Sequence, residues 1–241
     1  ILRHINIKPE QIVILTDEMR GGEAEAERYG VEFVEKRLTE SNFRAALDNR
    51  LGEGDFLLNL SVEVASTALI ELCQKKGVRY LDTCIEPWPG GYTDPNLSVS
   101  RRSNYALRDT MLKLKPRYSG GPTAVVAHGA NPGLVSHFVK QALMNIAHDT
   151  GVKTAAPTTR EGWGKLAQRL GIKTIHIAER DTQVSRKPKE VGEFVNTWSI
   201  DGFVSEGCQP AEMGWGTHEK TLPPDGKRHT FGCDAAIYLN R

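Results

Sequence analysis

Polar residues stand where several short apolar runs of the sequence end: Asp17, Asn59, Ser61, Asp82, Thr83 and Glu86. If these runs are parallel strands, their carboxyl ends meet at one rim of a sheet, where ligands of such sheets bind. A carboxylate at a strand end can accept hydrogen bonds from the hydroxyls of an adenosine ribose, and its charge repels a 2′-phosphate. Asp17 is thus a candidate for binding NAD rather than NADP. A plain cap or turn at Asp17 is the alternative.

Two loops carry further candidates. In IEPWPGGYTD, residues 85–94, two prolines stiffen the chain beside Glu86, and two glycines then let it turn. In GANPG, residues 129–133, glycines permit close backbone approach to a ligand, and Asn131 offers a donor and an acceptor. The alternative is a plain strand-to-helix turn capped by Asn131. For Trp88 we expect a packing role.

The elements that would position these residues alternate in the first half of the chain. We expect strands at 11–17, 55–61 and 78–84 and helices at 38–51, 61–77 and 101–115, and then a strand, a tight loop and a long helix over 123–151. This alternation predicts an α/β fold with a doubly wound parallel sheet. A glycine-rich GxGxxG turn after a first strand is missing from the sequence, so either no dinucleotide binds or the chain begins after that turn.

The second half changes character after a helix in GWGKLAQRLG. We expect a strand at 172–183 and then strands in EFVNTWSIDGFVSEG, GWGTHE and AAIYLNR, which indicate a mainly antiparallel sheet in an α+β domain. Asp201-Gly202 between apolar runs predicts a hairpin that brings Trp198 near Glu206. The alternatives are core packing for Trp198 and for His128, His137 and His176, and a solvated strand end for residues 179–181.

Composition excludes several classes of protein. The 31 Lys and Arg are scattered and nearly match the 30 Asp and Glu, which argues against nucleic-acid binding. Apolar runs are too short for a membrane span, and the first residues do not resemble a signal peptide, so we expect a soluble, cytoplasmic protein. Cysteines 73, 84, 208 and 233 form neither a CxxC pair nor a metal quartet, so we expect free thiols and no metal.

Taken together, five blocks resemble bacterial homospermidine synthase: VILTD, DTCIEPWPGGYTD, VAHGANPGLVSHF, IHIAERDTQ and NTWSIDGFVSEGCQPAEMGWGTHE. They are long, correctly ordered and spread over nearly the whole chain. The resemblance implies a Rossmann-like NAD-binding domain at 1–133, without its first strand and glycine-rich loop, and a substrate domain at 134–241. Both would be incomplete, because the chain looks like an internal piece of a longer enzyme.

The resemblance also implies a reaction. Putrescine would be oxidised with NAD, lose ammonia, condense as an imine or aldehyde equivalent with a second putrescine, and be reduced again, in an enzyme that is a homodimer. Glu86, Glu179 and Glu206 would bind the amines, Asn131 would position substrate or nicotinamide, Trp198 would lie beside the charged intermediate, and Glu63 matches an acidic position of the family. Asn59, Ser61 and Thr83 would contact the cofactor together with Asp17.

Physical chemistry favours this allocation. A diammonium substrate needs carboxylates at both ends, because an unpaired ammonium is costly to remove from water. An indole face stabilises a cation without offering a nucleophile. The alternatives are a saccharopine-dehydrogenase-like oxidoreductase acting on an amino acid, which would need a cationic clamp for the carboxylate, and a nucleotide-binding module without chemistry.

Overall fold

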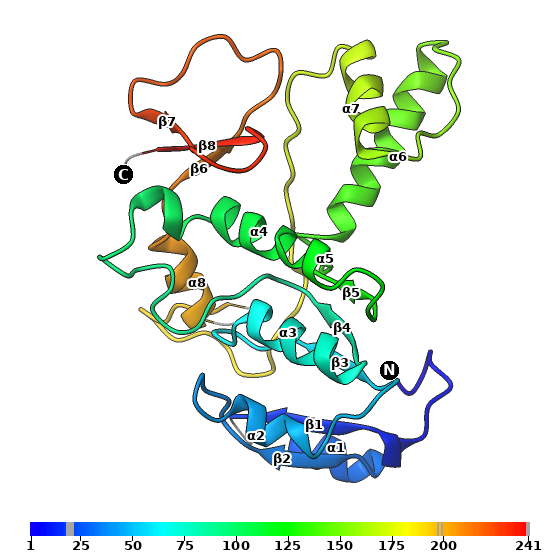
Figure 1. Ribbon diagram of the computed structural model, residues 1–241, viewed down its shortest axis with the longest axis vertical. Helices are drawn as coiled ribbons and strands as arrows, with labels where there is room; N and C mark the ends of the chain where they lie inside the picture. Colours follow the sequence, from blue (N-terminus) through cyan, green and yellow to red (C-terminus); the bar gives the residue numbers. More distant parts are fainter. Residues whose placement is uncertain (18–21, 197, 199, 240–241) are drawn as a thin grey trace. The chain divides into compact units, whose positions relative to one another are not determined.

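Two units divide the computed structural model, Ile1–Glu53 and Gly54–Arg241, and each is described by itself (Figure 1). The structure describes residues 1–17, 22–196, 198 and 200–239. The expected strands around residues 197–199 and at 240–241 therefore fall partly outside the described residues. Among the described helices, none is long and apolar enough to cross a membrane.

The first unit is a small parallel β-α-β arrangement. The 3-10 turn η1 (Pro9–Gln11) leads into β1 (Val13–Thr16), and β1 pairs in parallel with β2 (Glu32–Glu35), Val13 opposite Glu32. Helix α1 (Glu23–Tyr29) connects the two strands and ends at Gly30, whose φ of 69° suits glycine. Helix α2 (Phe43–Asp48) buries Phe43 and Leu47. The strand expected at 11–17 is confirmed, and Asp17 directly follows it.

The second unit contains the parallel sheet that carries most candidate residues. Strand β4 (Arg79–Asp82) lies between β3 (Phe56–Asn59) and β5 (Ala124–Val125), and both pairings are parallel, with Asn59 opposite Asp82. The carboxyl ends of β3 and β4 therefore lie side by side, as expected from the sequence.

Helix α3 (Ser66–Lys76) covers this sheet with a buried stripe of Leu69, Ile70, Leu72 and Cys73 and ends at Gly77. It begins five residues later than predicted. Residues 61–65 form a loop instead, because Glu63 has a φ of 60° and Ala65 is extended in ψ, which a helix cannot accommodate.

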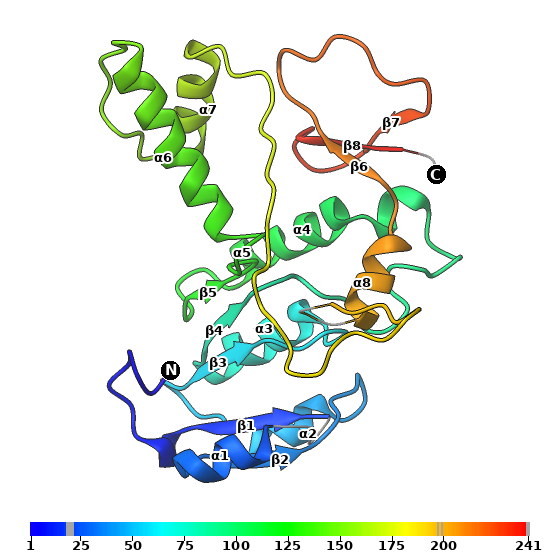
Figure 2. The same cartoon turned by 180° about the vertical axis from the view of Figure 1, so that it is seen from behind.

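Beyond the sheet, helices form where the sequence predicted them, but one of them is interrupted. The expected helix at 101–115 is broken into η2 (Val99–Arg102), α4 (Asn104–Leu112) and α5 (Leu114–Arg117). Helix α6 (Leu134–Asp149) is the long helix expected after GANPG, and α7 (Arg160–Arg169) packs beside it in both views (Figure 2).

Residues 172–196 run from α7 to α8 without helix or strand (Figure 2). The strand predicted at 172–183 is therefore wrong. Its apolar side chains, including Ile175 and Ile177, are exposed, so here the apolar pattern has no partner strand among the described residues.

The predicted hairpin at Asp201-Gly202 is also wrong, because Ile200–Gly207 forms helix α8. Ile200, Phe203 and Val204 recur at i, i+3 and i+4, the helical spacing, and this periodicity prevails over the Asp-Gly turn signal. The rings of Phe194 and Trp198 lie 5.0 and 6.2 Å from the ring of Phe203.

A second, antiparallel sheet completes this unit, with β8 (Ala236–Leu239) between β6 (Glu212–Gly214) and β7 (Gly226–Arg228). It packs on the start of α4, where the Glu212 carboxylate accepts the backbone N–H groups of Asn104 and Tyr105 at 2.8 and 3.1 Å. Buried His229 bonds the Ser100 hydroxyl at 2.8 Å and stacks on Tyr105. Sequence analysis predicted an antiparallel sheet in this region but missed β7. The strand expected in GWGTHE is wrong, because β6 ends at Gly214.

Candidate functional site

Glu86 lies in the loop after β4 and is held there by the first residue of α3. The Glu86 N–H donates to the Ser66 hydroxyl at 3.1 Å, and the Ser66 N–H donates to the Glu86 carbonyl at 2.9 Å. Ser66 is fully buried. This reciprocal pair fixes the backbone of Glu86 at the rim of the parallel sheet.

The charges of two further glutamates act on the Glu86 carboxylate. Burial raises the pKa of Glu86 above its ordinary value of 4.5, and the negative charges of Glu63 and Glu206 raise it further. The backbone N–H of Glu63 and the Cys84 thiol oppose this shift by hydrogen bonding to the carboxylate. We call Glu63, Glu86 and Glu206 the acidic cluster. Loop 61–65, the loop after β4 and helix α8 supply one member each, and both views show α8 alongside the loop after β4.

Cys84 and Tyr92 border the acidic cluster, and sequence analysis gave neither a role. Burial and the nearby charge of Glu86 raise the pKa of the Cys84 thiol to about 12, so it remains a hydrogen-bond donor. The pKa of Tyr92 is raised by burial and then by Glu86, and its hydroxyl donates to the Ile85 carbonyl at 3.3 Å. Their positions in DTCIEPWPGGY, two residues before Glu86 and six after it, are the sequence feature from which a role beside Glu86 could have been predicted.

A buried polar chain lies below this rim. Asn59 accepts the Ser61 N–H at 3.2 Å and its hydroxyl at 2.5 Å, and donates to the Tyr80 hydroxyl at 3.1 Å. Tyr80 in turn donates to Asp82 at 2.9 Å. Asn59 is thus tied into the interior, whereas Ser61 is exposed and Thr83 is half-buried.

The GANPG loop is compact. The Gly129 N–H donates to the Pro132 carbonyl at 2.8 Å, and the Asn131–Pro132 peptide bond is cis. A Cβ on Gly129 would lie 3.0 Å from the Thr83 carbonyl oxygen, so glycine permits the loop to pack against the end of β4. Asn131 is exposed and does not cap α6, because the residue at the N-cap is Gly133. The capping alternative for Asn131 is therefore wrong.

Trp198 and Glu206 come from the α8 region, and only Glu206 belongs to the acidic cluster, which Glu179 does not join. Trp198 is 50% exposed, which argues against the core role that was its alternative. Glu206 is exposed near the C-terminal end of α8, and its charge acts on Glu86. Glu179 lies on the exposed segment 172–196, and the acidic groups that shift the pKa of Glu86 are Glu63 and Glu206.

Some other candidates lie outside these contacts. Asp17 is exposed after β1 in the first unit. Trp88 lines an open hollow of about 430 Å³ together with Pro89, Gly90, Gly91, Thr93, Asp94 and Pro95.

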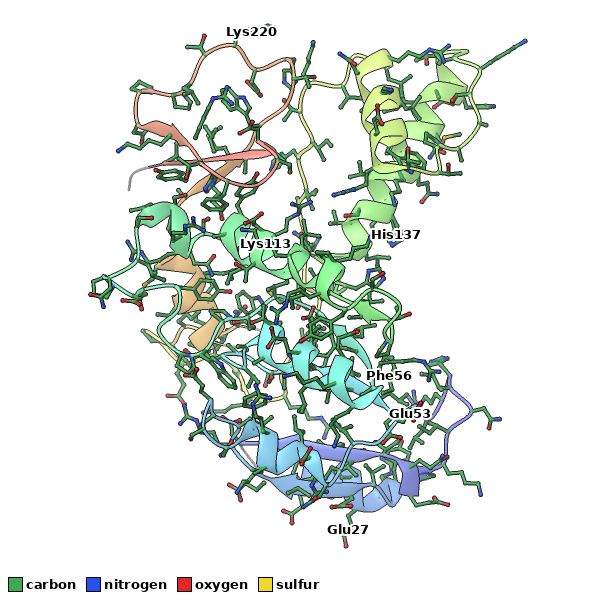
Figure 3. The ribbon with its side chains drawn as sticks, viewed as in Figure 1. Glu27, Glu53, Phe56, Lys113, His137 and Lys220 are labelled. Atoms are coloured by element: carbon green, nitrogen blue, oxygen red, sulfur yellow. The ribbon has the colours of Figure 1, made fainter. Side chains whose placement is uncertain are left out.

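The expectation that His128, His137 and His176 lie in a core is wrong, since all three are exposed. His137 is on the N-terminal part of α6 (Figure 3). The rings of His128 and His137 meet edge to face at 5.4 Å, and all four cysteines are free.

Comparison with known proteins places this geometry in a family. The saccharopine dehydrogenase NADP binding domain matches residues 1–125, and the saccharopine dehydrogenase C-terminal domain matches residues 129–241. Homospermidine synthases from Blastochloris viridis and Mesorhizobium japonicum are 50% and 48% identical over 99% and 100% of this chain, which spans about half, 50%, of each relative.

A solved structure agrees with the sequence comparison. The crystal structure of the homospermidine synthase from Legionella pneumophila in complex with NAD matches all of this chain and 50% of its own, with 44% identity and a TM-score of 0.82. The α/β class with a separate antiparallel sheet is thereby confirmed, as is the resemblance on which the sequence analysis rested. The sequence and structure of the chain are thus similar to one half of known homospermidine synthases, and the chain belongs to the saccharopine dehydrogenase family.

Proposed function

We propose that the protein carrying this chain is an NAD-dependent homospermidine synthase, which converts two putrescines into homospermidine and ammonia. The observation that carries the proposal is the acidic cluster, in which burial and two like charges raise the pKa of Glu86. Such a site is electrostatically unfavourable when empty and is relieved by a cation. A diammonium substrate supplies two cations. The relatives at about half identity are homospermidine synthases, which supports the same substrate class.

Glu86 and Glu206 bind the ammonium groups in this proposal, and Glu63 adds negative charge beside them. A protonated amine close to Glu86 lowers the pKa of that carboxyl, so substrate binding and loss of the Glu86 proton are coupled. Trp198, half-exposed two residues before α8, offers an indole face for the positively charged intermediate. Glu179 is the third amine-binding residue of the proposal, and the resemblance to homospermidine synthase supports its assignment.

The residues present fit a nicotinamide cofactor at the rim of the parallel sheet. A bound NAD supplies hydride acceptance and return. In this proposal Asp17, after β1 of the first unit, would hold the ribose hydroxyls. Ser61, Thr83 and Asn131 would contact the cofactor, and buried Asn59 would orient Ser61, whose N–H and hydroxyl it accepts. The exposed side chains of Ser61 and Asn131 support this assignment. Gly133 keeps the rim loop compact, because a Cβ there would lie 2.5 Å from the Gly129 carbonyl oxygen.

An amino-acid oxidoreductase is the second candidate, because both matching domains carry the saccharopine dehydrogenase description. A substrate with a carboxylate needs a cation beside its binding site. The residues whose charges act on Glu86 are acidic, which favours the diamine.

The wider organisation follows the same proposal. We assign residues 1–133 to cofactor binding and 134–241 to substrate binding, a division supported by the two domain matches, which meet between residues 125 and 129. We further propose that the enzyme is a homodimer and acts in the cytoplasm.

The test is product analysis. The full-length protein that contains these 241 residues is incubated with NAD and putrescine, and ammonia and polyamines are measured. Homospermidine and ammonia in equal amounts, without net formation of NADH, support the proposal. Net NADH formation with saccharopine, and none with putrescine, would identify the amino-acid oxidoreductase instead.

A further inference from the structure

Asp82 is the last residue of β4 and is fully buried. Its carboxylate accepts the Ala127 N–H at 2.6 Å on one oxygen and the Tyr80 hydroxyl at 2.9 Å on the other. The Ser66 hydroxyl also stabilises its charge. Burial raises the pKa of Asp82, and these three donors oppose the shift. Its donors Ala127 and Ser66 lie on two other elements, and Tyr80, on β4 itself, also bonds Asn59 of β3. The carboxylate is therefore suited to hold these elements in register.

The first of these elements is the loop of Asn131. Asp82 binds it twice, because the His128 N–H also donates to the Asp82 carbonyl at 2.9 Å. Ala127 has a φ of 53°, a left-handed conformation that residues other than glycine rarely adopt. The bond to Asp82 therefore stabilises a backbone conformation that alanine would not hold by itself.

Hydrogen bonds within the loop connect the backbone near Ala127 to Asn131. The Leu134 N–H donates to the Gly129 carbonyl at 2.9 Å, and the Gly129 N–H binds the Pro132 carbonyl. These bonds close residues 129–134 into one compact turn. A change in the backbone at Ala127 would move this turn, with Asn131 on it.

The second element is the loop of Glu86. Ser66, which lies against the Asp82 carboxylate, also accepts the Glu86 N–H and donates its own N–H to the Glu86 carbonyl. The third element is β3, because Tyr80 joins Asp82 to Asn59. One buried carboxylate thus connects the two loops and the strand that carry Asn131, Glu86 and Asn59.

We propose that Asp82 is a positioning residue, which sets the loop of Asn131 relative to Glu86 and thereby aligns the reacting amine. This inference rests on the proposed function for its catalytic part. Asp82 does not touch the substrate, so its loss acts on turnover more than on amine binding.

The test compares Asp82→Asn with Tyr80→Phe in the full-length protein. An asparagine of the same size loses the negative charge that strengthens the bond to the Ala127 N–H, and its NH2 group faces the Tyr80 hydroxyl, which already accepts the Asn59 NH2 group. Tyr80→Phe removes a hydrogen bond from the same network but leaves the bond between Asp82 and Ala127. Both variants should lower the melting temperature.

Asp82→Asn should also lower kcat on the order of 10- to 100-fold with little change in KM, as expected for misplacement of reacting groups. Tyr80→Phe should stay within about threefold, because it leaves the backbone bonds that hold the loops of Asn131 and Glu86.

Rescue separates positioning from stability. Because glycine adopts a positive φ without strain, Ala127→Gly added to Asp82→Asn should recover most of kcat. Amide hydrogen exchange over residues 126–134 should rise in Asp82→Asn, stay unchanged in Tyr80→Phe and fall again in the double variant.

Equal loss of kcat in Asp82→Asn and Tyr80→Phe at equal melting temperature would overturn the proposal, as would absence of rescue by Ala127→Gly. If Asp82→Asn does not fold, the pair is compared in the Ala127→Gly background, and failure to fold there as well would show that Asp82 serves folding alone. If the wild-type protein makes no homospermidine, the proposed function fails, while hydrogen exchange still decides whether Asp82 holds the loop.

Discussion

The backbone N–H of Glu63 hydrogen-bonds the carboxylate of Glu86, while the side chain of Glu63 places a like charge beside it. Glu63 has a φ of 60°, which interrupts the expected helix at 61–77 and turns this N–H toward Glu86. One residue therefore both stabilises and repels the charge of Glu86. The net effect is a raised pKa of Glu86. Burial contributes most to it, and the charges of Glu63 and Glu206 add to burial.

We expect Glu86→Gln to lose turnover and gain stability at neutral pH. Because the folded-state pKa of Glu86 is raised, the native protein holds this proton to a higher pH than the unfolded chain does. Wild-type stability therefore falls as the pH rises from the ordinary value of 4.5 through the raised value. Glutamine removes this loss. Urea unfolding should show the variant more stable at neutral pH and the difference vanishing below the window.

The contrary outcome is also informative. A Glu86→Gln protein that is less stable than the wild type at neutral pH would show that the bonds from the Glu63 N–H and the Cys84 thiol outweigh burial and repulsion.

Glu206→Gln and Glu179→Gln form a matched pair, because each removes one negative charge from an exposed side chain. Both should lower turnover with little change in melting temperature, since exposed carboxylates contribute little to folding. Only Glu206→Gln should lower the pKa of Glu86 and move the acidic limb of the kcat/KM profile to lower pH. An equal shift in both variants would place Glu179 beside Glu86 in the complete enzyme.

Trp198→Phe and Trp198→Leu separate cation stabilisation from packing. Phenylalanine keeps a weaker π face and leucine keeps only apolar bulk. Activity should therefore fall in the order Trp, Phe, Leu, and loss of about 2 kcal/mol from the charged intermediate slows turnover about thirtyfold. Melting temperatures should stay close, because Trp198 is already 50% exposed. Equal activity of the two variants at equal stability would remove the cation role.

Asp17→Ala should weaken NAD binding and relax discrimination against NADP, because the carboxylate would no longer bind the ribose hydroxyls or repel a 2′-phosphate. Titration of the full-length protein with each cofactor measures both effects. Asp17→Asn serves as a control that keeps hydrogen bonding and removes the charge. Unchanged affinities in Asp17→Ala would leave Asp17 as an ordinary turn residue.

The sequence predicted the parallel part of the fold well, for a physical reason. Strands β3 and β4 are apolar runs that end in Asn59 and Asp82, and α3 has a Gly77 stop, so each element carries its own local signal. The rim position of Glu86 follows from the strand end alone. The first unit was partly missed, because α1 (Glu23–Tyr29) is rich in charge and β2 has only two half-buried residues to mark it.

The α8 region could not be predicted in the same way. Asp201-Gly202 is a strong local turn signal that competes with the helical spacing of the apolar residues of α8. The contacts of Phe203 with Phe194 and Trp198 favour the helix. Local pattern also gave no sign that Glu63 and Glu206, 143 positions apart in the numbering, would act on one carboxyl group. Such convergence depends on folding of the whole unit.

The attachment of the antiparallel sheet to α4 has a consequence for the order of events during synthesis. Glu212, which accepts the first N–H groups of α4, follows Tyr105 by 107 residues, and His229 follows Ser100 by 129 residues. At a translation rate of about 5–20 residues per second, roughly 5–20 s separate the synthesis of α4 from that of its acidic partner. During this interval the start of α4 depends on the Ser103 hydroxyl, which accepts the Ala106 N–H. A nascent chain paused near residue 200 would thus expose the faces of Tyr105 and Ser100 that His229 later covers, and chaperone binding would be strongest at that stage.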